Sequence, residues 1–283
     1  MKTDSPVPRG TRAILAAFAA ARAEGRAALI TYLTAGYPTP AHSPELLRAL
    51  TAGGADLLEV GVPFSDSVAD GPTIQNAAHA ALRAGTTPQG CLHLVAGLRA
   101  EGLDIPILLM GYYNPILTWG PQAFARACHG AGVDGLIVPD LPPEEAAPLQ
   151  EACRGLGLSL VFMVAPTTSP ERISRIAAAT EGFLYLISRL GTTGAKEGQA
   201  PAVEPALVER LSLVRRLAHT PVALGFGLSR PEQLHALAPL ADGLIVGSAI
   251  VERSKEGAEA LRAYVETLRS ALYYGLAPQR RSL

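Results

Sequence analysis

The sequence predicts one α/β domain, a (β/α)₈ TIM barrel, from two observations. Eight short apolar runs recur along the 283 residues, and each is followed by turn residues and then by a helical pattern. The runs are continuous and not alternating, as in parallel strands that are covered on both faces. An open, doubly wound sheet is the alternative, but no GxGxxG turn follows the first run. The eight predicted strands are Ala28–Gly36, Asp56–Val62, Ile105–Tyr113, Gly135–Asp140, Leu158–Pro166, Gly182–Ser188, Pro221–Gly227 and Gly243–Ala249.

Segments rich in Ala, Leu, Arg and Glu lie between the runs and are predicted to be helices. Two capping signals support this pattern, because each places a hydroxyl before a Pro and a Glu in the first helical turn. The capping signals are Ser169-Pro170-Glu171 and Ser229-Arg230-Pro231-Glu232. The predicted helices include Ser43–Ala52, Gln122–Ala131, Glu144–Leu156 and Pro231–Leu240.

An extra helix is predicted before the first strand. The apolar stretch Ala13–Ala21 follows two arginines and faintly resembles a signal peptide, but it is mostly alanine and charged residues follow it at once. Ile14, Leu15 and Phe18 share one helical face, which predicts an amphipathic helix that covers the domain.

The predicted domain spans residues 1–283, with frayed ends at 1–11 and 275–283. Long connections follow the second strand, from Pro63 to Asp104, and the sixth strand, from Arg189 to Thr220. Because the loops after the strands form the active face of a barrel, we expect these two connections to act as lids.

Composition excludes several classes of function. The apolar content is 48% and the charged content is 17%, which is ample for a core and too apolar for disorder. The formal charge of −1 and the aromatic content of 5% argue against a nucleic-acid surface. Cys91, Cys128 and Cys153 are widely spaced, as expected of small core residues in a reducing cytoplasm and not of a metal or disulfide set.

Two carboxylates near the second strand are the first candidate catalytic residues. Glu59 lies inside an apolar run, and Asp70 closes the Gly-, Pro-, Ser- and Asp-rich loop that follows. A buried carboxylate without a partner is costly, so such a residue often ionises less readily or serves chemistry. The pair predicts acid/base catalysis, although an ion-paired Glu59 and a helix-capping Asp70 are the structural alternatives.

Glycine-rich strand ends predict a phosphate site. Gly225 and Gly227 end the seventh predicted strand, Gly247 and Ser248 follow the eighth, and 191–194 adds two further glycines. Phosphate oxygens approach backbone N–H groups closely where no Cβ intervenes, and barrels often bind phosphate at this place. Tight turns are the structural alternative.

The sequence lacks the residues that two known aldolase chemistries require. None of the three lysines lies in a predicted strand, which argues against a Schiff base, and no pair of histidines has zinc-ligand spacing at a strand end. We therefore expect no metal and no cofactor. The remaining expectation is carboxylate proton transfer on a small phosphorylated molecule.

The motif from Glu59 to Gln75, EVGVPFSDSVADGPTIQ, resembles that of the tryptophan synthase alpha chain family. The resemblance continues through Leu109–Pro115, Gly135–Pro142 and Gly225–Ser229, and covers about Arg12 to Ala271. It implies a (β/α)₈ barrel that cleaves indole-3-glycerol phosphate to indole and glyceraldehyde 3-phosphate. It also implies an α₂β₂ complex with a β chain, a role in tryptophan biosynthesis, and the cytoplasm as location.

The resemblance implies roles for individual residues. Glu59 matches the glutamate that shuttles protons, and Asp70 matches the acid that hydrogen-bonds the indole N–H. The implied substrate-binding residues are Tyr185, Thr193, Tyr112, Leu109 and Phe226, and the implied phosphate-binding residues are Gly194, Gly227, Gly247 and Ser248.

One departure concerns the partner. Ser67 stands where the family usually has proline, on the loop that normally meets the β chain. Because proline restricts φ, serine is expected to make this loop more mobile and to alter control by the partner. The alternatives are a stand-alone lyase of a specialised pathway, another phosphate-sugar isomerase or epimerase, and a non-catalytic barrel that activates a β chain.

Overall fold

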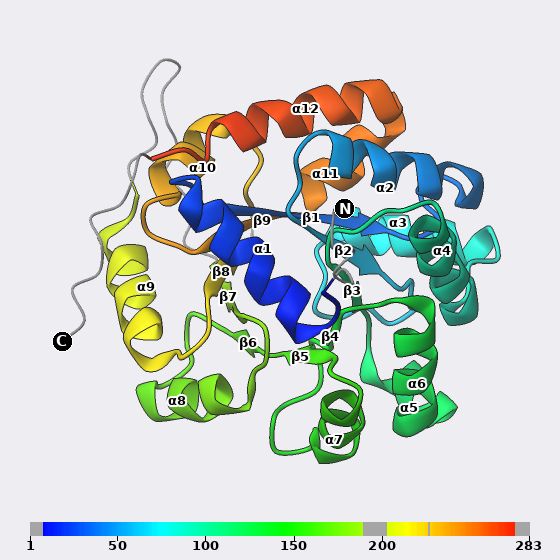
Figure 1. The fold of residues 1–283 in the computed structure, drawn as a ribbon, viewed down its shortest axis with the longest axis horizontal. Helices are drawn as coiled ribbons and strands as arrows, with labels where there is room; N and C mark the ends of the chain where they lie inside the picture. The colour runs from blue at the N-terminus through cyan, green and yellow to red at the C-terminus, as the bar shows by residue number, and fades with distance from the viewer. Residues whose placement is uncertain (1–7, 189–202, 226, 275–283) are drawn as a thin grey trace, which may run out of the picture.

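The computed structural model describes residues 8–188, 203–225 and 227–274 and contains one parallel sheet that curves into a nearly closed barrel (Figure 1). The strand order is β5-β4-β3-β2-β1-β9-β8-β7-β6. The strands are β1 Ala28–Thr34, β2 Leu57–Gly61, β3 Ile107–Met110, β4 Gly135–Ile137, β5 Ser159–Val161, β6 Met163–Val164, β7 Leu184–Ile187, β8 Val222–Gly225 and β9 Gly243–Val246.

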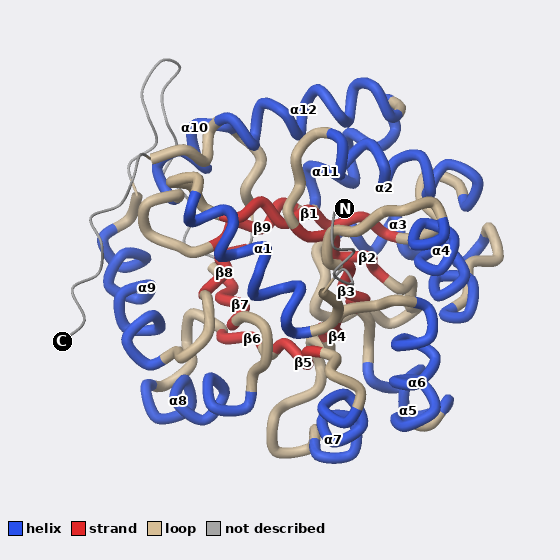
Figure 2. The backbone as a smooth tube through the Cα atoms, in the orientation of Figure 1, coloured by secondary structure: helices blue, strands red, loops and turns tan. Residues whose placement is uncertain are grey.

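Helices surround this sheet on its outer face (Figure 2). The α-helices are α1 Thr11–Ala23, α2 Ser43–Ala52, α3 Pro72–Arg83, α4 Pro88–Ala100, α5 Tyr113–Trp119, α6 Pro121–Ala131, α7 Ala147–Gly155, α8 Pro170–Ala179, α9 Pro205–Leu217, α10 Pro231–Leu237, α11 Ser248–Arg253 and α12 Ala258–Ser270. Two 3₁₀ turns, η1 Pro40–His42 and η2 Ser254–Glu256, complete the described elements. The predicted TIM barrel with an extra N-terminal helix is therefore confirmed.

The fifth predicted strand differs from the prediction, because it is divided into β5 and β6. β5 pairs with β4, whereas β6 pairs with β7. The division falls at Phe162. Its N–H donates to the Thr180 hydroxyl at 3.0 Å and not to a neighbouring strand. The sheet closes through this residue, so eight apolar runs produce nine strands.

Helix α1 lies across one end of the barrel (Figure 1). Ile14 and Phe18 are buried, and the Phe18 ring lies 5.5 Å from that of Phe183 at the barrel axis. Leu15 was expected on the same face but is 40% exposed, because the buried positions 14, 18 and 21 follow the helical repeat and position 15 lies beside it.

Side-chain alternation along the strands creates two apolar layers. Inward-facing residues fill the barrel, and outward-facing residues pack against the helices. On β2 this places Leu57 in the barrel and Leu58 and Val60 under the helices. Glu59 follows the same alternation and therefore faces inward.

The two predicted helix caps have different outcomes. The Ser169 hydroxyl accepts the N–H of Arg172 at 3.3 Å, as predicted. The predicted Ser229 cap is wrong. Gln233 Oε1 instead accepts the N–H groups of Ser229 and Arg230, each at 3.0 Å, because its longer side chain reaches back over the first turn.

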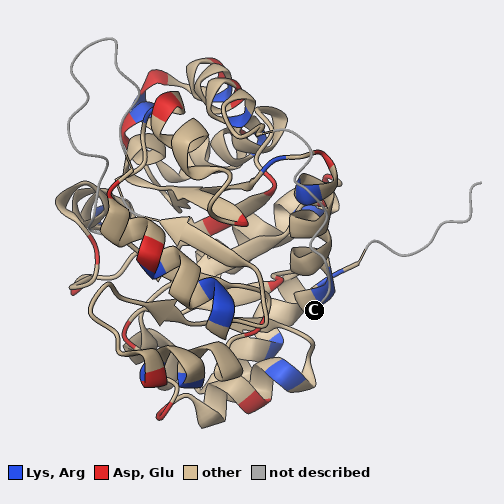
Figure 3. Cartoon of the chain, turned by 90° about the vertical axis from the view of Figure 1, so that its left-hand side faces the viewer, with Lys and Arg blue, Asp and Glu red and all other residues tan. Residues whose placement is uncertain are grey.

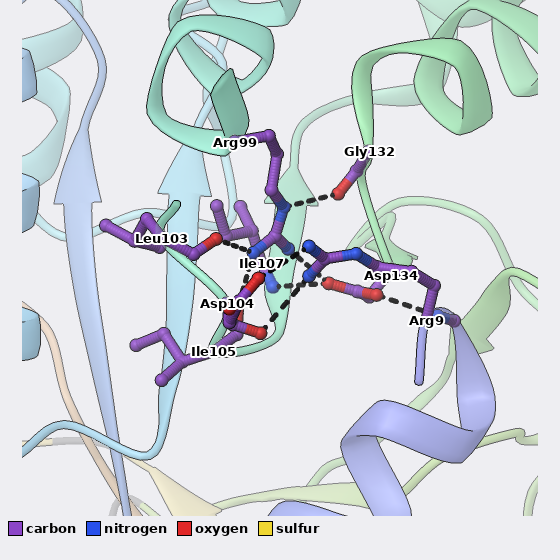
Figure 4. A network of polar contacts seen from close by, with 9 residues as sticks. Arg9, Arg99, Leu103, Asp104, Ile105, Ile107, Gly132 and Asp134 are labelled. Carbon is purple, nitrogen blue, oxygen red and sulfur yellow. Dashed lines mark hydrogen bonds and ion pairs between the residues drawn. The ribbon is translucent and has the colours of Figure 1, made fainter. Parts of the chain in front are cut away.

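A polar network joins the chain start to the beginnings of β3 and β4 (Figure 4). Asp134 is fully buried and accepts hydrogen bonds from the N–H groups of Gly10, at 2.7 Å, and Ile107, at 2.9 Å. Arg99 forms an ion pair with Asp134 at 2.5 Å and donates to three backbone carbonyls. Burial lowers the pKa of Arg99 to about 10, so the guanidinium remains charged at neutral pH.

This network also places the first described residues. Arg9 donates to the Asp104 carboxylate at 2.9 Å and to its carbonyl at 3.1 Å. Arg9 and Gly10 thus contact the barrel, although both lie in the segment expected to fray.

The surface carries charges of both signs on many helices (Figure 3). In the described part of the chain, no helix combines the length and the apolar content that crossing a membrane requires.

We predict that Asp134→Ala lowers the free energy of unfolding by about 3–5 kcal/mol, because it leaves the Arg99 charge and two N–H groups buried without their partner. Urea unfolding measures the loss. The matched control is Asp104→Ala, whose ion pair with Arg9 is solvent-exposed and whose loss should cost at most about 1 kcal/mol. Equal effects of the two substitutions would contradict this account of the network.

Candidate active site

The Glu59 carboxyl belongs to the middle residue of β2 and faces the inside of the barrel. Parallel pairing aligns Glu59 with Tyr32 of β1 and with Leu108 of β3. The residue is 1% exposed, and neither carboxyl oxygen has a hydrogen-bond partner in the described part of the chain. Desolvation raises the pKa of Glu59 to about 8, so the protonated form predominates at neutral pH. The alternative of an ion-paired structural glutamate has no support among the described residues.

Asp70 lies on the loop between β2 and α3 and is partly buried. The Tyr112 hydroxyl donates to Asp70 Oδ2 at 3.1 Å and accepts the N–H of Ala69 at 2.9 Å. Burial raises the pKa of Asp70 to about 6, and the Tyr112 hydrogen bond opposes the shift. Asp70 is therefore mostly ionised at neutral pH, in contrast to Glu59.

Further hydrogen bonds hold the same loop. The Ser67 carbonyl accepts the N–H of Asp70 and the side-chain amide of Gln75, each at 3.1 Å. Gln75 also donates to the Asp70 carbonyl at 3.0 Å. Ser67 itself is buried, so the serine at this position forms part of a packed turn.

Two tyrosines fill the barrel mouth between the strands. A Cβ on Gly61 would lie 2.0 Å from the Tyr32 hydroxyl, and a Cβ on Gly225 would lie 2.5 Å from the Tyr185 hydroxyl. Glycine is thus required at both strand ends by the close approach of a phenol. Burial raises the pKa of Tyr185 well above its ordinary value, and the charges of Glu59 and Asp70 add to the shift.

Tyr32 is a residue of the barrel mouth that was not among the predicted site residues. Its hydroxyl contacts Thr34 Oγ1 at 3.2 Å. Burial raises its pKa, and the charges of Asp70 and Glu59 add to the shift. Strand alternation in the first apolar run, combined with parallel pairing to the second, could have found it.

The glycine rim, defined as Gly227, Gly247 and Ser248, lies at the carboxyl ends of β8 and β9. Gly227 has a φ of +71°, and a Cβ placed there would meet no atom of the described residues within 4 Å. A Cβ on Gly247 would lie 3.6 Å from Tyr32 Cβ, the residue that pairs with Glu59. The rim and the two carboxyls therefore share one end of the barrel. The predicted site residues Thr193, Gly194 and Phe226 lie outside the described residues.

Leu109 does not face the barrel interior. It packs in the layer between strands and helices and borders a cavity of about 20 Å³, which has room for about one water molecule. The inward positions of β3 belong to Leu108 and Met110, because alternate residues face opposite sides of the sheet.

The described residues contain no cluster of three or more His, Cys, Asp or Glu side chains that could hold a metal ion. The site therefore consists of a protonated and an ionised carboxyl, several phenols and an open glycine rim. Two carboxyls with separated pKa values can divide the roles of acid and electrostatic partner.

Residues 18–274 match the family model for the tryptophan synthase alpha chain. The chain belongs to the tryptophan synthase alpha chain family. Its role is therefore that of the alpha subunit in tryptophan biosynthesis. Among curated relatives, the tryptophan synthase alpha chain of Caulobacter sp. (strain K31) is 47% identical over 242 residues, which cover 86% of each chain. The alpha chain of Roseiflexus sp. (strain RS-1) is 48% identical over 257 residues, which cover 89% of this chain and 97% of the relative.

Solved structures of the tryptophan synthase alpha chain family share the fold. The Mycobacterium tuberculosis tryptophan synthase structure aligns with a TM-score of 0.84 and 39% identity, over 93% of this chain and 98% of that one. The tryptophan synthase subunit alpha of Legionella pneumophila str. Paris aligns with a TM-score of 0.82 and 34% identity, over 92% and 97% of the two chains.

Proposed function

We propose that this chain cleaves indole-3-glycerol phosphate to indole and glyceraldehyde 3-phosphate by a retro-aldol reaction. The observation that carries the proposal is the Glu59 carboxyl, buried and without a hydrogen-bond partner in the described structure, at the barrel end that also holds Asp70 and the glycine rim. A protonated acid beside an anion-binding rim suits a substrate with a basic ring carbon and a phosphoryl group.

Glu59 would act first as an acid and then as a base. The protonated carboxyl gives its proton to indole C3, which turns the ring into a leaving group and places positive charge on the ring nitrogen. The resulting carboxylate removes the C3′ hydroxyl proton, the C3–C3′ bond breaks, and its electrons restore the indole ring. One proton leaves Glu59 and one returns, so the side chain ends in its starting state.

Asp70 would stabilise the charge that develops on the indole nitrogen by accepting a hydrogen bond from its N–H. The raised but still acidic pKa, about 6, keeps Asp70 ionised at neutral pH, as this role requires. Tyr112 supports the role because its hydroxyl fixes Asp70 Oδ2.

The glycine rim would bind the phosphoryl group through backbone N–H groups. No atom of the described residues lies within 4 Å of a Cβ placed on Gly227, which supports close approach by an anion. Gly194 is proposed to contribute to the same site, and Thr193 and Phe226 to contact the substrate beside Tyr185.

We predict that Glu59→Gln lowers indole release from indole-3-glycerol phosphate by about 10²–10⁴-fold, because the amide cannot transfer the proton. The wild-type kcat/KM should rise with pH through about 6, as Asp70 ionises, and fall through about 8, as Glu59 loses its proton. Asp70→Asn should remove the rise on the acid side and lower the rate.

The control for these variants is Glu101→Gln, an exposed glutamate that pairs with Arg48 on the surface. It should match the wild type in rate and in pH profile. A Glu59→Gln variant that retains the wild-type rate would refute the proposed role of Glu59 and would favour a non-catalytic barrel.

We also propose that the chain acts with a tryptophan synthase β chain, in an α₂β₂ complex, and contacts it through the loop between β2 and α3. Val68 on this loop is 82% exposed, and Leu117 of α5 is 57% exposed. Exposed apolar side chains on the segments that follow the strands suit a partner surface. The free, buried state of the three cysteines fits a reducing compartment such as the cytoplasm.

We predict that Val68→Asp weakens binding of the β chain about tenfold or more in calorimetric titration, because a charge then enters the contact. Leu15→Asp, an exposed apolar site on α1 across the opposite barrel end, should bind like the wild type. Equal affinities of the two variants for the β chain would show that the β chain does not contact the loop between β2 and α3.

Indole release measured with and without added β chain tests the altered control expected from Ser67. The β chain should raise indole release little in the wild type and more in Ser67→Pro, since proline restricts the loop. A strong rise in the wild type would contradict altered control.

A further inference from the structure

Tyr264 lies on α12, outside the barrel, yet its hydroxyl reaches the loop that carries the glycine rim. The Tyr264 hydroxyl donates to the Ser229 carbonyl at 2.6 Å. The side chain is 9% exposed, so this contact is shielded from water. A buried phenol normally finds one polar partner, and here that partner is two residues beyond Gly227.

The other backbone group of Ser229 is also held. Its N–H donates to Gln233 Oε1 at 3.0 Å. Leu228, between Ser229 and Gly227, is buried in the layer between strands and helices. The chain leaving Gly227 is thus fixed by one apolar anchor and two hydrogen bonds, one of which comes from Tyr264.

The Tyr264 ring contacts the helix that follows the second part of the rim. The Arg253 guanidinium lies 4.5 Å from the ring centroid, in a cation–π contact. Arg253 ends α11, the helix that begins at Ser248. Figure 1 shows α12 beside both α10 and α11, so one side chain connects the segments after β8 and β9.

We infer that Tyr264 is a positioning residue for the phosphoryl group, because it holds the two segments of the glycine rim at a fixed separation. This inference rests on the proposed function, in which the rim binds phosphate. Backbone N–H groups bind an oxyanion well when they are already in place. Tyr264 acts through Ser229 and Arg253 and does not itself touch the substrate.

The inference separates phosphate binding from proton transfer. Tyr264 lies behind the rim, whereas Glu59 and Asp70 lie on and after β2. Loss of the Tyr264 hydroxyl should therefore weaken binding of the phosphoryl group without changing the chemical step at the indole ring.

The test compares Tyr264→Phe with Tyr273→Phe in the full chain. Tyr273 is a matched control, since it also contacts an arginine, Arg269, through its ring, and its hydroxyl contacts Glu24 away from the rim. Tyr264→Phe should raise the dissociation constant of inorganic phosphate, measured by competition, about 3–10-fold, as expected for one hydrogen bond. The KM for indole-3-glycerol phosphate should rise similarly, kcat should change less than about twofold, and the affinity for indole should not change.

A second variant keeps the inference testable if Tyr264→Phe fails to fold. Arg253→Gln retains the phenol and removes the cation–π contact from a half-exposed arginine, and it should produce a smaller shift in the same two constants. Tyr264→Phe with wild-type phosphate affinity, or with kcat and indole affinity lowered as much as phosphate affinity, overturns the inference. In that case a wild type that still releases indole leaves the proposed function intact. A wild type that neither binds phosphate nor releases indole overturns both.

Discussion

The site depends on a glutamate carboxyl that is buried in an apolar barrel without a hydrogen-bond partner in the described structure. Removing a carboxyl from water penalises its charged form, and no arginine, lysine or backbone N–H in the described residues offsets this for Glu59. The protein therefore holds an acid that keeps its proton at neutral pH. The surrounding structure keeps Glu59 protonated, because β1 and β3 flank β2 and the apolar side chains inside the barrel exclude water from the carboxyl.

Parallel strands explain why so few residues can form this site. All strands run parallel, so their carboxyl ends lie at one barrel end, where the loop after β2 and the distant glycine rim after β8 and β9 are brought together. Helix α1 covers the opposite end, and the network of Arg99 and Asp134 ties the chain start to that end. Stability and chemistry are thus placed at opposite ends of the barrel.

Much of the fold could be predicted, because continuous apolar runs and helical periodicity are local signals. The division of the fifth run at Phe162 could not, since it depends on a hydrogen bond from the Phe162 N–H to the distant Thr180 hydroxyl. The Ser229 cap was predicted wrongly for a similar reason. The general capping rule does not consider that the longer Gln233 side chain can accept the N–H of Ser229.

The candidate site shows the same contrast. Glu59 was identified by its chemistry, because a carboxylate in an apolar run is conspicuous. Leu109, implied as a substrate-binding residue, packs in the layer between strands and helices, and strand register decides this. The bond from Tyr112 to Asp70 joins residues 42 apart in the sequence, so no local pattern reveals it.

The central claim is that the Glu59 carboxyl is protonated at neutral pH. Carbon-13 NMR of the side-chain carboxyls, in protein labelled at glutamate, measures this directly when the spectrum of Glu59→Gln identifies the missing resonance. The account predicts a titration midpoint near pH 8 for Glu59. A midpoint near the ordinary value for glutamate, 4.5, would contradict it.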